Sequence, residues 1–155
     1  MDQLQVRKAE PADAGSVTRL LDELGYPASD DDIADRLRWF SRSGADHVLA
    51  AVSDAEAVGL LTLSVVPRFV VAGRFARITT LAVPPGGARD RIERALVSEA
   101  ESLAARHGCT GVEVIATRRP DGQIDEPFTS LDYVVADEHE VRYEKTLAPS
   151  SPVRI

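Results

Sequence analysis

The sequence is poor in cysteine and has no long apolar segment. Cys109 is the one cysteine in 155 residues, which excludes an intramolecular disulfide and a metal site built from several cysteines. No run approaches the roughly 18 apolar residues of a membrane-spanning helix. The first residues, MDQLQVRKAEP, lack the apolar core of a secretory signal. We therefore expect a cytoplasmic protein with no membrane partner.

Positive charge is also scarce. Lys and Arg total 18 against 25 Asp and Glu, which gives a formal net charge of −7. Nucleic-acid affinity comes largely from basic side chains that neutralise phosphates, so this balance argues against a nucleic-acid partner and mildly favours small cationic or neutral ones. Hydrophobic residues make up 44%, as in ordinary globular proteins. The length predicts one domain over residues 1–147 and a flexible C-terminal tail at 148–155.

Apolar residues at helical spacing predict three long helices. The first starts near Pro11 and stops at Gly25, because proline suits a first helical turn and glycine a C-terminal stop. The second spans the segment from Asp30 to Phe40. The third and strongest follows the twin prolines at 84 and 85 and ends at Gly108. A fourth, short helix is predicted at Phe128–Leu131.

Alternating or continuous apolar segments predict the strands of one sheet. The expected strands are Leu4–Ala9, His47–Ser53, Ala57–Pro67, Arg74–Val83 and Gly111–Thr117, with a terminal hairpin from Tyr133–Asp137 and His139–Leu147. A strand, a crossover helix and a further strand imply a parallel pair near the middle of a mixed sheet. The predicted fold class is therefore α/β with three layers.

Clusters that suggest metal or nucleophilic chemistry have simpler explanations. The run Asp30–Asp32 is typical of an acidic first turn stabilised by the helix dipole. His47, His107 and His139 are scattered in the sequence, so a shared site is not expected. Cys109 lies between a helix end and a strand, where it favours a core position over a nucleophile. We predict no metal site.

The segment LAVPPGGARDRIERAL (Leu81–Leu96) resembles the GNAT superfamily of acetyl-CoA-dependent N-acetyltransferases. The resemblance extends from Val6 to about Leu147. ARITTLAV precedes the loop, RALVSEAESLAARHGC follows it, and LDY (Leu131–Tyr133) stands where the family has Leu-Gly-Phe. The resemblance implies a GNAT-like mixed central sheet of about seven strands flanked by about four helices. It also implies acetyl-CoA as cofactor, direct attack by a small-molecule or peptide amine, and the option of a homodimer.

The family's fourth strand ends in a splayed edge that pairs with the pantetheine arm of coenzyme A. The resemblance assigns this role to Leu81, Ala82 and Val83. The loop that follows carries an R/Q-x-x-G-x-G/A signature, in which amides at a helix N-terminus bind the pyrophosphate. Aligned without gaps, the signature falls on Ala88, Arg89, Asp90, Arg91, Ile92 and Glu93.

The three key positions of this signature are replaced. Ala88 stands for the basic or amide residue, and Arg91 and Glu93 stand for the glycines. Asp90 and Glu93 add negative charge where an anion should bind, and two unit charges about 4 Å apart repel by roughly 4 kcal/mol at an effective dielectric near 20. Arg89, Arg91 and Arg94 can offset this by binding phosphates through their side chains. The alternative is a surface helix whose first turn carries i,i+4 ion pairs.

The usual catalytic residues are replaced as well. The family's tyrosine acid falls on Phe128, which has no proton to give. The glutamate base of the fourth strand falls on Thr79 or Thr80, whose hydroxyl cannot accept a proton near neutral pH as a carboxylate does. Glu113, on the next strand, is either a substitute base or a surface residue paired with an arginine. Alignment of the reactants alone can still supply much of the rate.

Four residues are candidates for the acceptor site. Tyr26 and Trp39 bracket the second helix, where they either stack on an acceptor or pack against the protein. Thr79 and Glu113 complete the set. Two functions stay open: an acyl-CoA-dependent N-acetyltransferase, and a catalytically inactive GNAT-fold module that binds another ligand or partner and not coenzyme A.

Overall fold

The structure is a computed structural model that describes residues 3–115, 127–136 and 141–148. Five strands form one sheet in sequence order. They are β1 (Gln5–Lys8), β2 (Asp46–Ser53), β3 (Glu56–Pro67), β4 (Arg74–Ala82) and β5 (Cys109–Val114). Neighbouring strands are antiparallel except β4 and β5, which are parallel. The mixed α/β class predicted from the sequence is confirmed.

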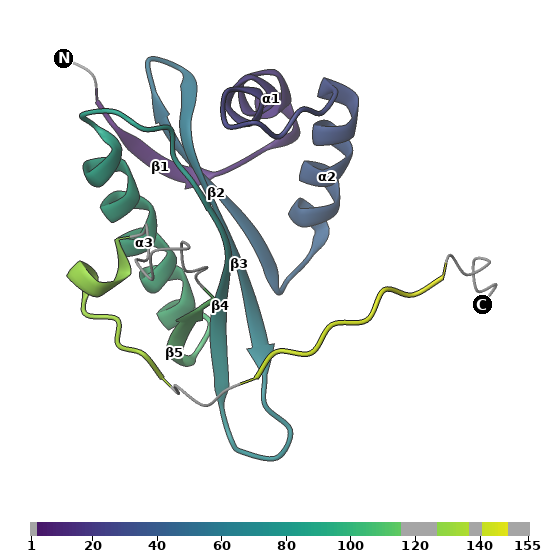
Figure 1. The fold of residues 1–155 in the computed structure, drawn as a ribbon, viewed down its shortest axis with the longest axis vertical. Coiled ribbons are helices and arrows are strands. Elements are labelled where there is room, and N and C mark those ends of the chain that lie inside the picture. The colour runs from purple at the N-terminus through teal and green to yellow at the C-terminus, as the bar shows by residue number, and fades with distance from the viewer. Residues whose placement is uncertain (1–2, 116–126, 137–140, 149–155) are drawn as a thin grey trace.

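Helices cover both faces of the sheet (Figure 1). α1 (Ala14–Glu23) and α2 (Asp30–Arg42) pack on one face through a core that includes Val17, Leu37 and Ala50. α3 (Arg89–Arg106) packs on the other through a core built on Leu61, Leu63, Leu96 and Val97, which are fully buried. The three long helices predicted from periodicity are confirmed. Two short 3-10 helices, Pro11–Asp13 and Phe128–Leu131, complete the helical elements of the described residues.

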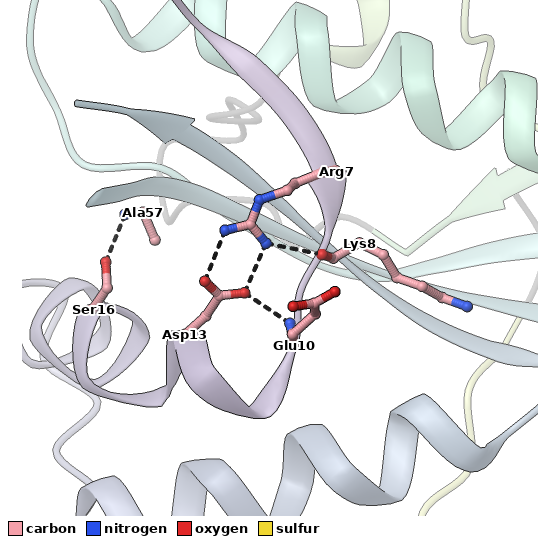
Figure 2. Close-up of polar contacts among 6 residues, drawn as sticks. All are labelled: Arg7, Lys8, Glu10, Asp13, Ser16 and Ala57. Carbon is pink, nitrogen blue, oxygen red and sulfur yellow. Dashed lines mark hydrogen bonds and ion pairs between the residues drawn. The ribbon is translucent and has the colours of Figure 1, made fainter. Parts of the chain in front are cut away.

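A partly buried ion pair joins β1 to the 3-10 helix that precedes α1. Arg7 donates from Nη1 and Nη2 to the two carboxylate oxygens of Asp13, each at 2.8 Å, and Asp13 also accepts from the backbone N–H of Glu10 (Figure 2). Farther along α1, the hydroxyl of Ser16 accepts from the backbone N–H of Ala57 at 2.6 Å, which ties the helix to β3. These contacts set α1 above the β2–β3 hairpin.

The ends of α1 and α2 follow the expected local chemistry. Gly25 adopts φ +86° just after α1, a left-handed conformation that favours glycine at a helix stop. Ser29 caps α2 by accepting a hydrogen bond from the N–H of Asp32 at 3.1 Å. The acidic run at 30–32 lies in the first turn of α2, in line with the structural interpretation of these residues.

The predicted count of about seven strands is wrong for the described residues. Tyr133–Ala136 and the segment 141–148, where the sequence predicts a terminal hairpin, contain no strand, and every residue of 141–148 is exposed. Alternation of apolar residues favours a strand but supplies no pairing partner. The parallel pair β4–β5 therefore lies at an edge of the described sheet, not near its middle. Residues 137–140 and 149–155 of the predicted hairpin and tail lie outside the described residues.

No helix within the described ranges is long and apolar enough to cross a membrane.

Candidate active site

β4 and β5 part before β4 ends. Their parallel pairing runs from Arg74 opposite Cys109 to Ile78 opposite Val114, where β5 stops. β4 continues to Ala82, and the edge of its last four residues has no strand partner on the β5 side within the described residues. Alternate N–H and C=O groups along such an edge are free to bind another extended chain.

A bulge marks the point of separation. On the β3 side, Thr62 pairs with Thr80 and Leu63 pairs with Ile78, so Thr79 is an extra residue without a partner. Bulges bend a strand and re-aim its side chains, and they are frequent next to active sites. The Thr79 hydroxyl lies 2.6 Å from the hydroxyl of Thr62. The bulge therefore presents a two-hydroxyl cluster beside the open edge.

An ion pair bridges the two parallel strands one step before they part. Arg77 donates from Nε to Oε1 of Glu113 at 2.6 Å, and both side chains are about half exposed. Ile78 and Val114 pack in the core under α3, so Arg77 and Glu113 face the other side of the sheet. The arginine partner foreseen as one role of Glu113 is thus present, and the carboxylate is not a free base.

The loop after β4 leads to the start of α3. Gly86 has φ +149°, and a Cβ placed on Gly86 or Gly87 would meet nothing within 4 Å, so the backbone is open to close approach here. The loop borders a hollow of about 340 Å³ that also contacts Glu23 of α1. The N–H of Arg89, the first residue of α3, donates to the carbonyl of Gly86 at 3.3 Å, whereas the next N–H groups of a helix have no acceptor within it.

Side chains modify that helix start. Glu93 is buried, with its side chain 9% exposed, and accepts a hydrogen bond from Nε of Arg89 at 2.7 Å. Arg94 binds Asp90 at 2.9 Å on the surface. Arg91 is exposed and has no ion-pair partner among the described residues. Arg91 is therefore the basic group of the first turn that remains available to an anionic ligand.

A family model described as the acetyltransferase (GNAT) family matches residues 16–126, the part of the chain that holds β2 to β5 and the loop. The chain belongs to the GNAT acetyltransferase family. No curated protein sequence matches it.

Solved structures share the GNAT fold. A GNAT family acetyltransferase from Staphylococcus aureus has 18% identity and a TM-score of 0.74, over 95% of this chain and 100% of that one. An aminoglycoside acetyltransferase from an uncultured soil metagenomic sample, in complex with sisomicin, has 20% identity and a TM-score of 0.71 over 94% and 97% of the two chains. The aminoglycoside N-acetyltransferase AAC(6')-Iy in complex with CoA has 14% identity and a TM-score of 0.71 over 94% and 96%. At these identities the likeness concerns the fold.

The residues predicted for the cofactor of this GNAT chain lie along one path. Leu81 and Ala82 end the open edge of β4, and the loop from Val83 leads to Ala88 before the first turn of α3. Val83 itself is 6% exposed and belongs to the core, so its side chain is not a ligand contact. Ile92 packs against Gly59 of β3 and also lines the hollow beside the loop.

The predicted acceptor residues do not share one hollow. Thr79 and Glu113 lie on strands beside the separation of β4 and β5. Trp39 borders a hollow of about 560 Å³ lined by α2, Ser43 and Asp46, with no residue of β4 or β5. Trp39 and Tyr26 are 62% and 66% exposed, so neither is packed in the core.

Sequence reasoning missed the part played by Gly59. A Cβ on Gly59 would lie 2.8 Å from Cγ2 of Ile92 and 3.0 Å from Cδ1 of Leu96. This glycine allows the start of α3 to lie directly on β3, which places the loop beside the end of β4. A glycine inside the apolar strand segment was the available signal, because glycine there marks close approach of another element.

His47 and His107 form a pair that their sequence separation conceals. Their ring centroids are 4.9 Å apart, and His47 is 3% exposed. Neither ring nitrogen of His47 makes a well-formed hydrogen bond within the described residues. Those residues contain no group of three or more metal-binding side chains.

Proposed function

We propose that this GNAT chain transfers an acetyl group from acetyl-CoA to the amine of a small molecule or peptide by direct attack of the amine. The observation that carries the proposal is the open edge of β4 from Thr79 to Ala82, beyond the last pairing with β5. An extended amide-containing arm can add to such an edge as a further strand. Membership of the family supports acyl transfer as the class of reaction.

The residues present fit coenzyme A, which backbone N–H and C=O groups and the exposed side chain of Arg91 would contact. The edge of β4 offers N–H and C=O groups to the pantetheine arm. The open backbone at Gly86 and Gly87 and the first amides of α3 would face the diphosphate, with Arg91 as a side-chain donor. Bound acetyl-CoA supplies an acyl group activated as a thioester.

The acceptor is proposed to lie on the face of the sheet opposite α3. Thr62 and Thr79 offer hydroxyls there, and the Arg77–Glu113 pair borders the same face. Solved relatives with this fold include aminoglycoside acetyltransferases, which favours small polyamine or amino-sugar acceptors. The net charge of −7 favours the approach of a cation.

Rate enhancement is proposed to come mainly from alignment of the two substrates. Phe128 is 6% exposed and has no acidic proton, and Glu113 is held by Arg77. General acid–base catalysis typically raises the rate by about 10²- to 10⁴-fold. Without it, the rate enhancement that comes from holding the two substrates in proximity remains. The amine must then lose its proton to solvent before it attacks, so the rate should rise with pH up to the pKa of the acceptor ammonium.

The Arg89–Glu93 pair supports a second candidate function. It places a buried carboxylate in the first turns of α3, where the family signature has glycine. In this alternative the chain is an inactive GNAT-fold module that binds another ligand and not coenzyme A.

One assay separates the two functions. The full chain is incubated with acetyl-CoA and a panel of amines, including an aminoglycoside and a linear polyamine, while free thiol is measured and products are weighed by mass spectrometry. If the chain is an acetyltransferase, we expect thiol release that depends on the amine and a product heavier by one acetyl group. No thiol release above the rate without protein supports the inactive module. Thiol release without an acetylated amine contradicts both functions, because it shows hydrolysis of acetyl-CoA and no transfer to an amine.

A further inference from the structure

The β3–β4 hairpin ends in an exposed apolar tip. Phe69, Val70 and Val71 are 103%, 94% and 59% exposed. The base of the hairpin is fixed. The N–H of Arg68 donates to the carbonyl of Gly73 at 3.1 Å, and Arg74 donates from Nη1 to the carbonyl of His107 at the end of α3. Figure 1 shows the hairpin extending beyond the helices at the lower end of the sheet. A well-anchored hairpin therefore holds apolar side chains in water.

The hairpin is basic in an acidic protein. Residues 57–88 contain no Asp or Glu, and their charged residues are Arg68, Arg74 and Arg77. The guanidinium groups of Arg68 and Arg77 lie 4.9 and 5.4 Å from the ring centre of Phe75. A surface that fits this tip should combine an apolar floor with acidic borders.

The same chain carries such a surface. A groove of about 930 Å³ runs between the second half of α3, β5 and residues 130–136. Ala104, Val112 and Leu131 supply apolar lining, and Glu101 and Asp132 supply carboxylates. Arg94 also lines the groove, and its charge is paired with Asp90. Burial and, after it, the charge of Asp132 raise the pKa of Glu101, in line with two carboxyl groups close together in this groove.

The groove also contains a buried polar atom that lacks a partner. The hydroxyl of Tyr133 is buried and makes no hydrogen bond within the described residues, and Tyr133 lines the groove. The tip and the groove lie at the same end of the sheet, because Arg74 at the base of the hairpin pairs with Cys109 at the start of β5.

We propose that two copies of this chain form a two-fold dimer in which the Phe69–Val71 tip of each copy enters the groove beside β5 of the other. In a two-fold dimer, two surfaces on one copy meet the same two surfaces on its partner reciprocally. Three side chains of this size expose on the order of 400 Å², so two reciprocal insertions remove about 1,600 Å² in total, the size of a standard stable interface. A single tip on a foreign surface buries half of that.

Sedimentation equilibrium of the full chain tests the proposal. The wild-type protein is expected to be dimeric in the micromolar range. The tip variant Phe69→Asp/Val70→Asp and the groove variant Ala105→Arg should each weaken dimerisation by at least about thirtyfold, as loss of an interface anchor does. Both changes are at exposed positions, so the fold is retained. Leu147→Asp, an exposed apolar position outside both surfaces, is the matched control and should leave the dimer intact.

Mixing the two variants gives the sharper test. Each variant keeps the surface that the other has lost, so an equimolar mixture should form heterodimers with one intact contact while each variant alone is monomeric. A monomeric wild-type protein overturns the proposal. So does a groove variant that dimerises as well as the wild type, because the tip then contacts a different surface. Loss of the dimer in Leu147→Asp would assign the interface to the C-terminal segment and contradict the proposal.

Discussion

Nε of Arg89 donates a hydrogen bond to a carboxylate oxygen of Glu93 one turn along α3, at 2.7 Å, and the Glu93 side chain is almost fully buried. A carboxylate close to a guanidinium accepts hydrogen bonds from the same N–H donors that a phosphate would use. Glu93 and a bound diphosphate therefore compete for Arg89. In our account this competition weakens coenzyme A binding without closing the open edge of β4.

Glu93→Ala should strengthen the binding of acetyl-CoA by about tenfold, because it removes a carboxylate that competes for Arg89 and a negative charge from the helix start. Alanine keeps the helix propensity that glycine would lose. Isothermal titration of the two proteins measures the change. Glu99→Ala is the control, since it removes a carboxylate of the same helix that pairs with Arg106, away from the helix start, and surface ion pairs contribute little. Equal affinity of Glu93→Ala and wild type would show that Arg89 takes no part in binding.

Gly59→Ala should lower the free energy of unfolding by about 1–3 kcal/mol, the usual cost of overpacking. The added Cβ would meet Ile92 and Leu96 and force the start of α3 away from β3. The affinity of the Gly59→Ala variant for acetyl-CoA should also be lower than that of the wild type. Urea unfolding and titration measure the two effects. Gly111→Ala in β5 is the control, because its Cβ would meet nothing within 4 Å. If both variants unfold like the wild type, α3 does not depend on close contact at Gly59.

Asp13→Ala should destabilise the protein by about 1–3 kcal/mol, because it removes a bidentate partner of Arg7 and the acceptor of the Glu10 N–H. The hydrogen bonds from Arg7 lower the pKa of Asp13, against the opposing effect of partial burial. This stabilisation is therefore full above the ordinary aspartate pKa, about 3.9, and is lost as pH falls below it. Urea unfolding should show convergence of the two proteins at low pH. A constant difference down to the lowest pH would contradict the ion-pair explanation.

His47 should make stability fall in mildly acidic solution. Burial lowers its pKa, and the positive charges of Lys8 and His107 act in the same direction, while Asp46 and the carbonyl of Gly44 oppose them. In the unfolded chain the pKa of His47 is near 6.5, so the unfolded state binds the proton more readily than the folded state. Stability is full above that pKa and falls as pH drops below it. His47→Phe should flatten the dependence of the unfolding free energy between about pH 7 and pH 5. An unchanged slope would assign the effect to other groups.

Local patterns predicted much of this fold. The stop at Gly25, the apolar face of α1 and the 3-10 helix at Phe128 depend on neighbours in sequence, so they could be read directly. The number of strands could not be predicted in this way, because the segment after Tyr133 alternates like a strand yet has no pairing partner in the described residues. Pairing depends on a distant edge, which spacing does not encode.

The candidate site was predictable only where the chain is continuous. Leu81 to Glu93 form one stretch of strand, loop and helix, and the structure keeps them together. The bulge at Thr79, the contact of Gly59 with Ile92 and the pairing of Glu93 with Arg89 depend on register and rotamer. Trp39 is displaced from the splayed strands because α2 presents it on its outer side.

The central claim is that the end of β4 receives coenzyme A despite the altered helix start. Calorimetric titration of acetyl-CoA into the full chain, with a thermal-shift measurement beside it, tests it most directly. We predict saturable binding with a micromolar dissociation constant and a rise in the unfolding temperature. Absence of heat and of any thermal shift at millimolar acetyl-CoA would contradict the claim.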